Sequence, residues 1–590
     1  MGKRSSRKGG TRGRRVESVE ERLALIEKLM SRLERVYISD VNFIRSPETE
    51  MLDAYGVRDR WKRFLEGPGR TLPRTGHYFN LYLHVPFCPR KCTFCIYPSR
   101  KPSGRKAVRR FVESAIAEME FFAEAFGSVA FLNFYAGGGT PSLLEPGELG
   151  EVIRGLRRLY RFETGGMRVI ECLPHHVTPE RALEFRQLGF TKVSFGVQSL
   201  DENVLRLGNR YYQPPSRIVE TVARTSAMEG LSVNVDLMMG LAGDDGKSFL
   251  RSFDLVAGAR PHYITISMFQ PPRPYVRKHF GGRFETYGAD LRERYRMARE
   301  RMVEIGERHG YDIDSLADST QGWQFIRRGL TMDHDYRRPY EVNALGEVPS
   351  SCFGVGEHAR SHLQGAGVVE HGPHAADPFD PSRRTYTYAS LDRRDEMIRH
   401  IFFHIYKSGS LSTRRFRRLF GRPIEKEFGH VLRELETLGM IERKGENLVF
   451  ASSDVRTLFV ASRLFLDRRT LLASLQGVDR ALLRVSAGGE AFHFLVGHPH
   501  PGGLQAAERS GYALFAVDEE GREIDALARG PVMRVLAGLL AKLFAPLVDR
   551  HPAATAEELA GALCRLLGAA ARRGGLPVSW RLSAEPYDAD

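Results

Sequence analysis

Cysteine is scarce in this chain, with only 6 in 590 residues. Three of them, Cys172, Cys352 and Cys564, stand far apart, so the sequence predicts no disulfide framework and favours a reducing compartment. No apolar run approaches the roughly 18 residues of a membrane-spanning helix, and no apolar segment follows the basic start of the chain as in a secretory signal. We therefore expect a cytoplasmic protein that does not enter a membrane.

Acidic residues are absent from residues 1–15, which carry seven Lys or Arg in a chain of net charge +15. With its Gly and Ser, this segment cannot bury a core, and we expect a disordered basic tail. Such a tail can contact nucleic acid or acidic partners. A solubilising role is the simpler interpretation, and nucleic acid is not an expected partner.

The middle of the chain alternates between strand-like and helix-like segments. The strand-like runs are short, apolar and rich in Val, Ile and Phe, and they lie at 78–85, 129–136, 167–172, 192–197, 232–238 and 263–269. Strands of this composition that alternate with helices indicate a parallel sheet covered on both faces. The sequence therefore predicts an α/β fold with a partial (β/α)6-type barrel over residues 76–385.

The flanking regions have other patterns. Residues 16–75 are mostly helical in pattern, which predicts an N-terminal helical extension. Residues 386–455 show three helices followed by a short hairpin, which predicts a winged-helix-like helical domain. Residues 456–590 combine strand-like runs with two helical segments, which predicts an additional small α/β domain.

The remaining cysteines, Cys88, Cys92 and Cys95, lie within eight residues at the end of the first predicted strand, with spacing C-x3-C-x2-C. Three thiolates this close can hold one iron–sulfur cluster. Three protein ligands on a four-iron cluster leave one iron open for a substrate. The alternative is a structural zinc site in which His84 is the fourth ligand.

Polar residues and glycines recur where the other predicted strands end: a glycine run from Gly137 to Gly139, then Glu171, Gln198 and Asp236. In parallel barrels, functional residues gather at this edge. Glycines admit a ligand close to the backbone, Glu171 can accept hydrogen bonds from ribose hydroxyls, and Arg210 offers a fork for a carboxylate. Beside an open iron, these groups indicate a site for S-adenosylmethionine.

These stretches resemble the radical S-adenosylmethionine (SAM) superfamily, and within it the HemN-like branch, which is named after oxygen-independent coproporphyrinogen III oxidase. The resemblance covers about 76–450 and rests on YLHVPFCPRKCTFC, YAGGGTPSLL, VSFGVQSLDENVLRLGNR, NVDLMMGLAG and, more loosely, FGVGEHARSHL. It implies that Cys88, Cys92 and Cys95 bind a [4Fe–4S] cluster. One-electron reduction would then cleave S-adenosylmethionine to a 5′-deoxyadenosyl radical, which abstracts hydrogen from a substrate.

The resemblance also implies two sets of binding residues. The contacts to the cluster-bound S-adenosylmethionine are Tyr82, Gly138 and Glu171. The contacts to a second S-adenosylmethionine are Phe94, Gly139, Thr140, Gln198, Arg210 and Asp236.

The chain departs from the oxidase around the expected substrate pocket. Tyr97 stands where the oxidase has a fourth cysteine, and Glu357, His358 and Arg360 stand where it is mostly apolar or small. We therefore expect Tyr82, Glu357 and His358 to be the catalytic or substrate-contacting residues.

The expected function is radical modification of a small organic molecule, by C-methylation or cyclopropanation with carbon from the second S-adenosylmethionine. Coproporphyrinogen III decarboxylation, a haem-binding chaperone and a nucleic-acid-acting protein are the alternatives. The expected partners are a small-molecule substrate and a one-electron donor such as flavodoxin or ferredoxin, and a monomer is favoured.

Overall fold

The computed structural model describes most of the barrel region and parts of both ends of the chain. The described residues are 19–30, 49–69, 77–95, 97–127, 129–269, 271, 273–281, 298–313, 322–330, 350–372, 378–407, 409–450, 460–466, 481–487, 490–497, 513–517, 540, 542–548, 550–551, 554–573 and 581–586. The predicted basic tail, residues 1–15, lies outside them. Among these residues, no helix combines the length and apolar character needed to span a bilayer.

The six strands predicted from the sequence form the wall of an arc. They are mutually parallel and adjacent in chain order: β2 (Tyr78–Val85), β3 (Ala130–Gly138), β5 (Arg168–Cys172), β6 (Lys192–Gln198), β7 (Ser232–Met239) and β8 (Tyr263–Met268). A short strand, β4 (Arg161–Phe162), pairs with the start of β3. The predicted α/β barrel arc is therefore confirmed.

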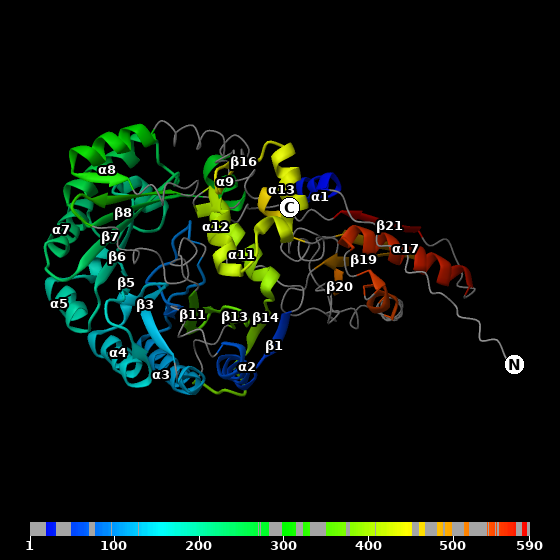
Figure 1. Ribbon diagram of the computed structural model, residues 1–590, viewed down its shortest axis with the longest axis horizontal. Helices are drawn as coiled ribbons and strands as arrows, with labels where there is room; N and C mark the ends of the chain where they lie inside the picture. The colour runs from blue at the N-terminus through cyan, green and yellow to red at the C-terminus, as the bar shows by residue number, and fades with distance from the viewer. Residues whose placement is uncertain are drawn as a thin grey trace.

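Helices cover the outer, convex face of the arc (Figure 1). They are α3 (Arg105–Ala123), α4 (Pro146–Leu159), α5 (Pro179–Gln187), α6 (Glu202–Leu207), α7 (Pro215–Ser226) and α8 (Lys247–Gly258). Local signals fix where several of them begin. Thr178 accepts a hydrogen bond from the Arg181 amide ahead of α5, and Glu145 and Glu148 form a reciprocal capping box at α4. Each helix can then bury its apolar stripe against the strands.

The sheet continues beyond both edges of the parallel arc. Past β8 it adds β10 (Gly322–Arg327) and β9 (Tyr311–Ile313), both antiparallel to their neighbours. Past β2 it adds β11 (Ser350–Val355), which is parallel to β2, and then the antiparallel strands β12 (Arg360–Leu363), β13 (Gly367–His371), β14 (Tyr386–Ser390) and β1 (Thr49–Leu52). Strand β11 therefore ends at the same edge as the predicted site strands.

Strand β11 and helix α2 (Ala54–Glu66) are joined by an aromatic cluster. Trp61 is 1% exposed, and its ring lies 5.2 Å from that of Phe122 and 5.6 Å from that of Phe353. Burial of one such side chain contributes about 1.5–3 kcal/mol. This aromatic cluster packs helix α2 against strand β11.

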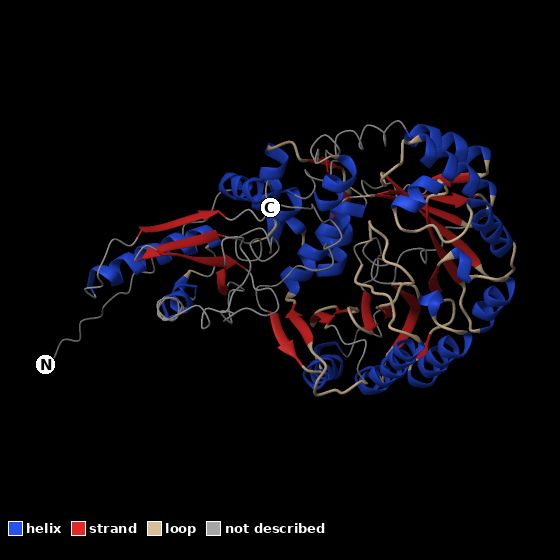
Figure 2. Ribbon diagram, turned by 180° about the vertical axis from the view of Figure 1, so that it is seen from behind, coloured by secondary structure: helices blue, strands red, loops and turns tan. Residues whose placement is uncertain are grey.

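The region after the barrel folds into a helical unit with a small sheet, on the side of the arc away from its helical cover (Figures 1 and 2). It contains α11 (Arg393–Lys407), β15 (Ser410–Ser412), α12 (Thr413–Phe420), α13 (Ile424–Thr437), β16 (Ile441–Lys444) and β17 (Asn447–Phe450). This helix and hairpin order matches the winged-helix-like pattern. Helix α1 (Val19–Met30) packs here through Ile26, and Arg22 donates to the Leu464 carbonyl over 2.9 Å.

The far end of the chain holds a separate antiparallel sheet with its own core. The sheet order is β20 (Ala513–Val517), β19 (Glu490–Gly497), β18 (Ala481–Ala487) and β21 (Arg581–Pro586), and α17 (Ala556–Arg573) packs on it. The remaining described helices include α9 (Arg273–Phe280), just after β8.

Candidate active site

The three clustered cysteines lie on the loop that follows β2. This cysteine loop comprises residues 86–95 and 97–101. Its ends are joined by a hydrogen bond of 2.9 Å from the Cys88 amide to the Arg100 carbonyl. Its middle is tied to the segment after α6, because the Thr93 amide donates to the Gly208 carbonyl over 3.1 Å. Main-chain hydrogen bonds therefore hold the loop both at its ends and in its middle.

Hydrogen-bond donors face two of the three sulfurs. The Thr140 hydroxyl donates to Cys88 Sγ and the Arg210 guanidinium donates to Cys92 Sγ, both over 3.3 Å. All three thiols are free of disulfides, and burial raises the pKa of the Cys95 thiol. Donors and positive charge at sulfur favour the thiolate form that iron requires.

His84 has other partners than a metal. Its Nδ1 lies 3.0 Å from the Tyr82 hydroxyl and its Nε2 lies 3.1 Å from the Pro98 carbonyl. Within the described part of the chain, no group of three or more His, Cys, Asp or Glu side chains converges on a single-ion site. This geometry disfavours the zinc alternative, in which His84 completes a tetrahedral set. Tyr97, at the position of the oxidase's fourth cysteine, is 42% exposed.

The glycine run at the end of β3 lies directly against the cysteine loop. A Cβ on Gly139 would lie 2.4 Å from the Phe87 carbonyl oxygen and 2.7 Å from that of Val85. The Gly139 amide donates to the Val85 carbonyl over 2.7 Å. Gly138 has φ +98°, a backbone conformation that side chains with a Cβ rarely adopt. Close approach and backbone conformation therefore both require glycine here.

Glu171, at the end of β5, is oriented by an aromatic neighbour. The Tyr135 hydroxyl donates to Glu171 Oε1 over 2.6 Å. A Cβ on Gly137 would lie 2.8 Å from the Tyr135 ring and 3.2 Å from the Glu171 carboxylate. Tyr82 is in register with Tyr135 on the neighbouring strand, and their rings are 6.1 Å apart. The structure thus brings Tyr82, Gly138 and Glu171 to one edge of three adjacent strands.

Arg210 and Gln198 meet at the end of β6. The Arg210 guanidinium donates to the Gly196 carbonyl as well as to Cys92. A Cβ on Gly196 would lie 2.7 Å from Arg210 Nη2 and 3.2 Å from Gln198 Nε2. Gln198 has φ +71° beside a register shift in the strand pairing. A non-glycine residue in this conformation stores strain of about 1–3 kcal/mol, a feature that clusters at ligand sites.

Asp236 and Phe94 occupy different surroundings. Asp236, opposite Gly196 on β7, accepts hydrogen bonds from Ser194 over 2.9 Å and from Asn234 over 3.0 Å. Phe94 is buried in an apolar cluster that anchors the cysteine loop. The other buried members of this cluster are Cys92, Val204, Leu241, Ala242, Phe269 and Tyr275.

Comparison with known proteins agrees with this geometry. Residues 82–256 match the family model described as the radical SAM superfamily. The chain carries a radical SAM domain. It is 31% identical over 199 residues to the oxygen-independent coproporphyrinogen III oxidase of Pseudomonas aeruginosa, across 33% of this chain and 42% of the relative. It is 30% identical over 204 residues to the heme chaperone HemW of Mycobacterium tuberculosis, across 34% and 52%.

The matches place the radical SAM domain in the HemN-like branch, although the chain spans about half the length of these two curated relatives. A longer alignment, over 387 residues at 22% identity, joins 64% of this chain to 96% of the heme chaperone HemW of Bacillus subtilis. The solved structure of coproporphyrinogen III oxidase (HemN) from Escherichia coli shares the fold, with a TM-score of 0.53 and 18% identity over 66% of this chain and 90% of that chain.

Radical SAM domains use S-adenosylmethionine and a [4Fe–4S] cluster, and the residues here fit both. A four-iron cluster held by three thiols has one iron open. The donors on Cys88 and Cys92 suit a negatively charged cluster, and Glu171 and Arg210 suit a ribose and a carboxylate.

Glu357 and His358, which the sequence predicts to be catalytic or substrate-contacting residues, lie near the cysteine loop. Both Glu357 oxygens accept hydrogen bonds from Arg100, over 2.6 Å and 2.7 Å, and the Glu357 side chain is 3% exposed. His358, with φ +60°, places Nε2 3.3 Å from Glu357 Oε1. Arg360 instead pairs with Glu370 over 3.5 Å. Glu357 and His358 are therefore together, at the end of β11.

The sequence reading missed a buried polar network behind Gly356. The Glu118 carboxylate, 5% exposed, accepts from the Gly356 amide and the Tyr386 hydroxyl, each over 2.9 Å, and lies 3.1 Å from His371 Nδ1. Burial opposes ionisation, but His371, the Gly356 amide and Arg384 hold the pKa of Glu118 below its usual range. The sequence held one signal for this network: Glu118 falls among the apolar positions on the buried face of α3.

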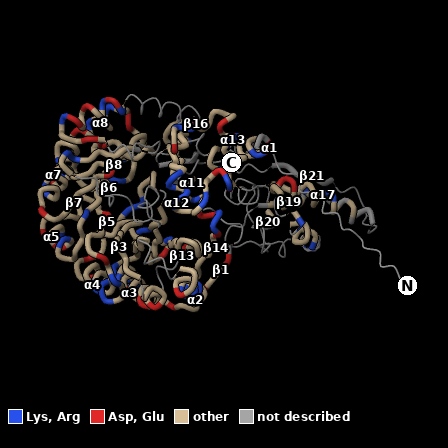
Figure 3. Tube along the Cα trace, in the orientation of Figure 1, with Lys and Arg blue, Asp and Glu red and all other residues tan. Residues whose placement is uncertain are grey.

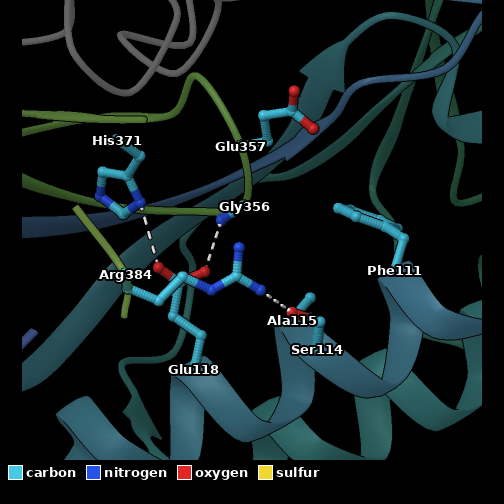
Figure 4. A pocket seen from close by; sticks show the side chains of 8 residues that line it. All are labelled: Phe111, Ser114, Ala115, Glu118, Gly356, Glu357, His371 and Arg384. Carbon is cyan, nitrogen blue, oxygen red and sulfur yellow. Dashed lines mark hydrogen bonds and ion pairs between the residues drawn. The ribbon is translucent and has the colours of Figure 1, made fainter. Parts of the chain in front are cut away.

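This network surrounds a small pocket (Figure 4). The lining residues are Phe111, Ser114, Ala115, Glu118, Gly356, Glu357, His371 and Arg384.

Proposed function

We propose that this chain is a radical SAM enzyme in which Cys88, Cys92 and Cys95 hold a [4Fe–4S] cluster. The observation that carries the proposal is the set of three free thiols, two of them facing hydrogen-bond donors, beside an oriented Glu171. These three cysteines would hold the cluster, and a bound, reduced cluster would supply the electron that splits S-adenosylmethionine into methionine and a hydrogen-abstracting 5′-deoxyadenosyl radical.

The chain's own residues would bind and orient S-adenosylmethionine. Glu171, held by the Tyr135 hydroxyl, would accept hydrogen bonds from ribose hydroxyls. Tyr82 and Gly138 would border the same molecule from β2 and β3. We assign Tyr82 to the reacting edge because its hydroxyl contacts His84, and His84 in turn contacts the Pro98 carbonyl of the cysteine loop.

A second S-adenosylmethionine would lie toward β6 and β7. The proximity of Arg210 and Gln198 around Gly196 supports this assignment, since a guanidinium and an amide together suit an amino-acid group. Asp236 faces Gly196 from the next strand. The resemblance implies that Phe94, Gly139 and Thr140 close this site from the cysteine-loop side. Thr140 donates to Cys88 Sγ, and Phe94 packs in the same cluster as Cys92.

With two molecules bound, the reaction we favour is C-methylation or cyclopropanation of a small organic substrate. The test is anaerobic reconstitution with iron and sulfide, followed by assay of 5′-deoxyadenosine. Enzyme given methyl-labelled S-adenosylmethionine and its substrate should yield labelled product. Absence of both cluster and 5′-deoxyadenosine would refute radical chemistry, and unlabelled product would refute carbon transfer.

Two other functions have a specific observation behind them. The oxidase of Pseudomonas aeruginosa supports coproporphyrinogen III decarboxylation, which predicts rescue of a strain that lacks the oxygen-independent oxidase. The alignment to 96% of the heme chaperone HemW of Bacillus subtilis supports haem binding, which predicts a Soret band after incubation with haem.

The expected electron donor is a small acidic protein such as flavodoxin or ferredoxin. Residues 86–112 carry eight Lys or Arg and no acid. Arg100, Arg105 and Arg109 pair with acidic side chains from elsewhere in the chain, whereas the side chains of Lys101, Lys106 and Arg110 are exposed. Figure 3 shows Lys and Arg positions, in blue, around α3 and α4. A positive surface next to the cysteine loop suits an acidic donor and makes its association sensitive to salt.

A further inference from the structure

Arg100 connects the two ends of the cysteine loop through its main chain. It forms a parallel bridge with Phe87. Its amide donates to the Pro86 carbonyl and its carbonyl accepts from the Cys88 amide, each over 2.9 Å. Because the first cysteine is bonded to Arg100 itself, a shift of Arg100 moves Cys88.

The Arg100 side chain is held by Glu357 in a two-point ion pair, at 2.6 Å and 2.7 Å. The two side chains are unequally exposed, 44% for Arg100 and 3% for Glu357. A buried carboxylate needs a charged partner, and the forked geometry is the strongest that arginine offers. Both carboxylate oxygens are thereby directed at the loop rather than at a substrate.

Glu357 projects from a firmly supported turn. The Gly356 amide donates to Glu118 over 2.9 Å (Figure 4). Glu118 in turn accepts a hydrogen bond from the Tyr386 hydroxyl. Gly356 has φ +96°, and a Cβ there would lie 2.6 Å from the His84 carbonyl oxygen. The turn therefore lies tight against the end of β2, from which the cysteine loop departs.

We propose that Glu357 and Arg100 form a clasp that keeps the cysteine loop in its cluster-binding conformation. Glu357 is then a positioning residue that acts on the cluster ligands through Arg100, and α3 supports it through Glu118. The inference rests on the proposed function for its chemistry, but the clasp itself is a property of the chain without iron.

The test compares Glu357→Gln, which keeps the side-chain shape and removes its charge, with the full-length unaltered protein. Glu370→Gln is the matched control, because it removes a carboxylate from an exposed ion pair at 3.5 Å on the neighbouring hairpin. Arg100→Lys is the second variant, since it alters a half-exposed side chain and retains the positive charge.

Two readouts report the loop without turnover: hydrogen exchange of peptides spanning 86–101 in the iron-free protein, and the rate of iron loss to a chelator after reconstitution. Loss of hydrogen bonds to a charged group predicts tenfold to hundredfold faster exchange, and the exposure of Arg100 favours the lower figure, about tenfold. Glu357→Gln should show this change and a comparable gain in iron release, Arg100→Lys a smaller one, and Glu370→Gln neither.

The outcomes separate the clasp from the proposed function. Exchange and iron release in Glu357→Gln that equal those of Glu370→Gln would overturn the clasp. Loss of 5′-deoxyadenosine formation with unchanged exchange and iron release would also overturn it, because Glu357 would then act on the substrate. If the unaltered protein binds no cluster, the proposed function fails, while the exchange result in the iron-free protein still decides the clasp.

Discussion

Replacing Gly139 with alanine should separate the end of β3 from the cysteine loop. The added Cβ would lie 2.4 Å from the Phe87 carbonyl oxygen and 2.7 Å from the Val85 carbonyl oxygen. Both obstacles are backbone atoms inside a packed region, so no side-chain rotation can relieve the overlap. An ordinary carbon–oxygen contact is about 3.3 Å or more, which requires a displacement of about 1 Å.

The cost follows from the contacts that this displacement breaks. The amides of Gly139 and Thr140 donate to the Val85 and Phe87 carbonyls, each over 2.7 Å. Loss of two such bonds costs about 0.5–1.5 kcal/mol each, and the overpacking costs about 1–3 kcal/mol. The local stability of the cysteine loop should therefore fall by about 2–6 kcal/mol, which raises its opening equilibrium about 30-fold or more.

Hydrogen exchange of peptides spanning the cysteine loop measures this opening directly. A chain with several cores is not expected to unfold in one step, so a single global free energy would not serve. The matched control is Gly147→Ala in the first turn of α4, where an added Cβ meets nothing within 4 Å. Exchange in Gly139→Ala within about threefold of the unaltered protein would refute the reasoning, as would an equal rise in the control.

Three further results are expected. Burial lowers the pKa of His77 to about 3 from 6.5, with His362 acting in the same direction and Glu396 against it; local stability around His77, measured by hydrogen-exchange protection, should fall as pH drops from 6.5 toward 3, and His77→Gln should flatten this pH dependence by up to one proton, about 1.4 kcal/mol per pH unit. Arg210→Lys keeps charge but loses the fork to Cys92 and Gly196, so the S-adenosylmethionine concentration for half-maximal transfer of methyl label to product should rise about tenfold, and an unchanged value would contradict the assignment to the second molecule. Lys101→Glu should slow reduction by an acidic donor at low salt and leave reduction by dithionite unaltered.

The parallel wall could be predicted from the sequence because its signals are local. Each strand is a short apolar run, and the predicted run 78–85 coincides with β2. Strand β11 is fully buried, but it begins with two serines and its place could not be predicted. Its partner β2 lies some 270 residues earlier in the chain, and the parallel register that joins Ser350 to Tyr78 depends on contacts that no local pattern encodes.

The same distinction divides the candidate site. The cysteines and glycines could be predicted to share an edge because they follow adjacent strands, and the contact of Gly139 with Phe87 is the result. The partner of Glu357 could not be predicted, since Arg100 is 257 positions away and a charge in a sequence does not specify which opposite charge it meets. The expectation that Glu357 contacts substrate came from its departure from the oxidase around the expected substrate pocket, and its nearly complete burial against Arg100 favours a different role.

The cysteine loop is fixed from three directions by different parts of the fold. The Thr140 amide bonds it at Phe87, the segment after α6 bonds it at Thr93, and the end of β11 holds Arg100. Two of the three are main-chain contacts that require no iron. Since sites with a rigid supporting shell are preorganised, these contacts would hold the loop around Cys88 and Cys92 in place before a cluster binds. Through Arg100, which lies 257 positions before Glu357 in the chain, the end of β11 would thus support the cysteine motif.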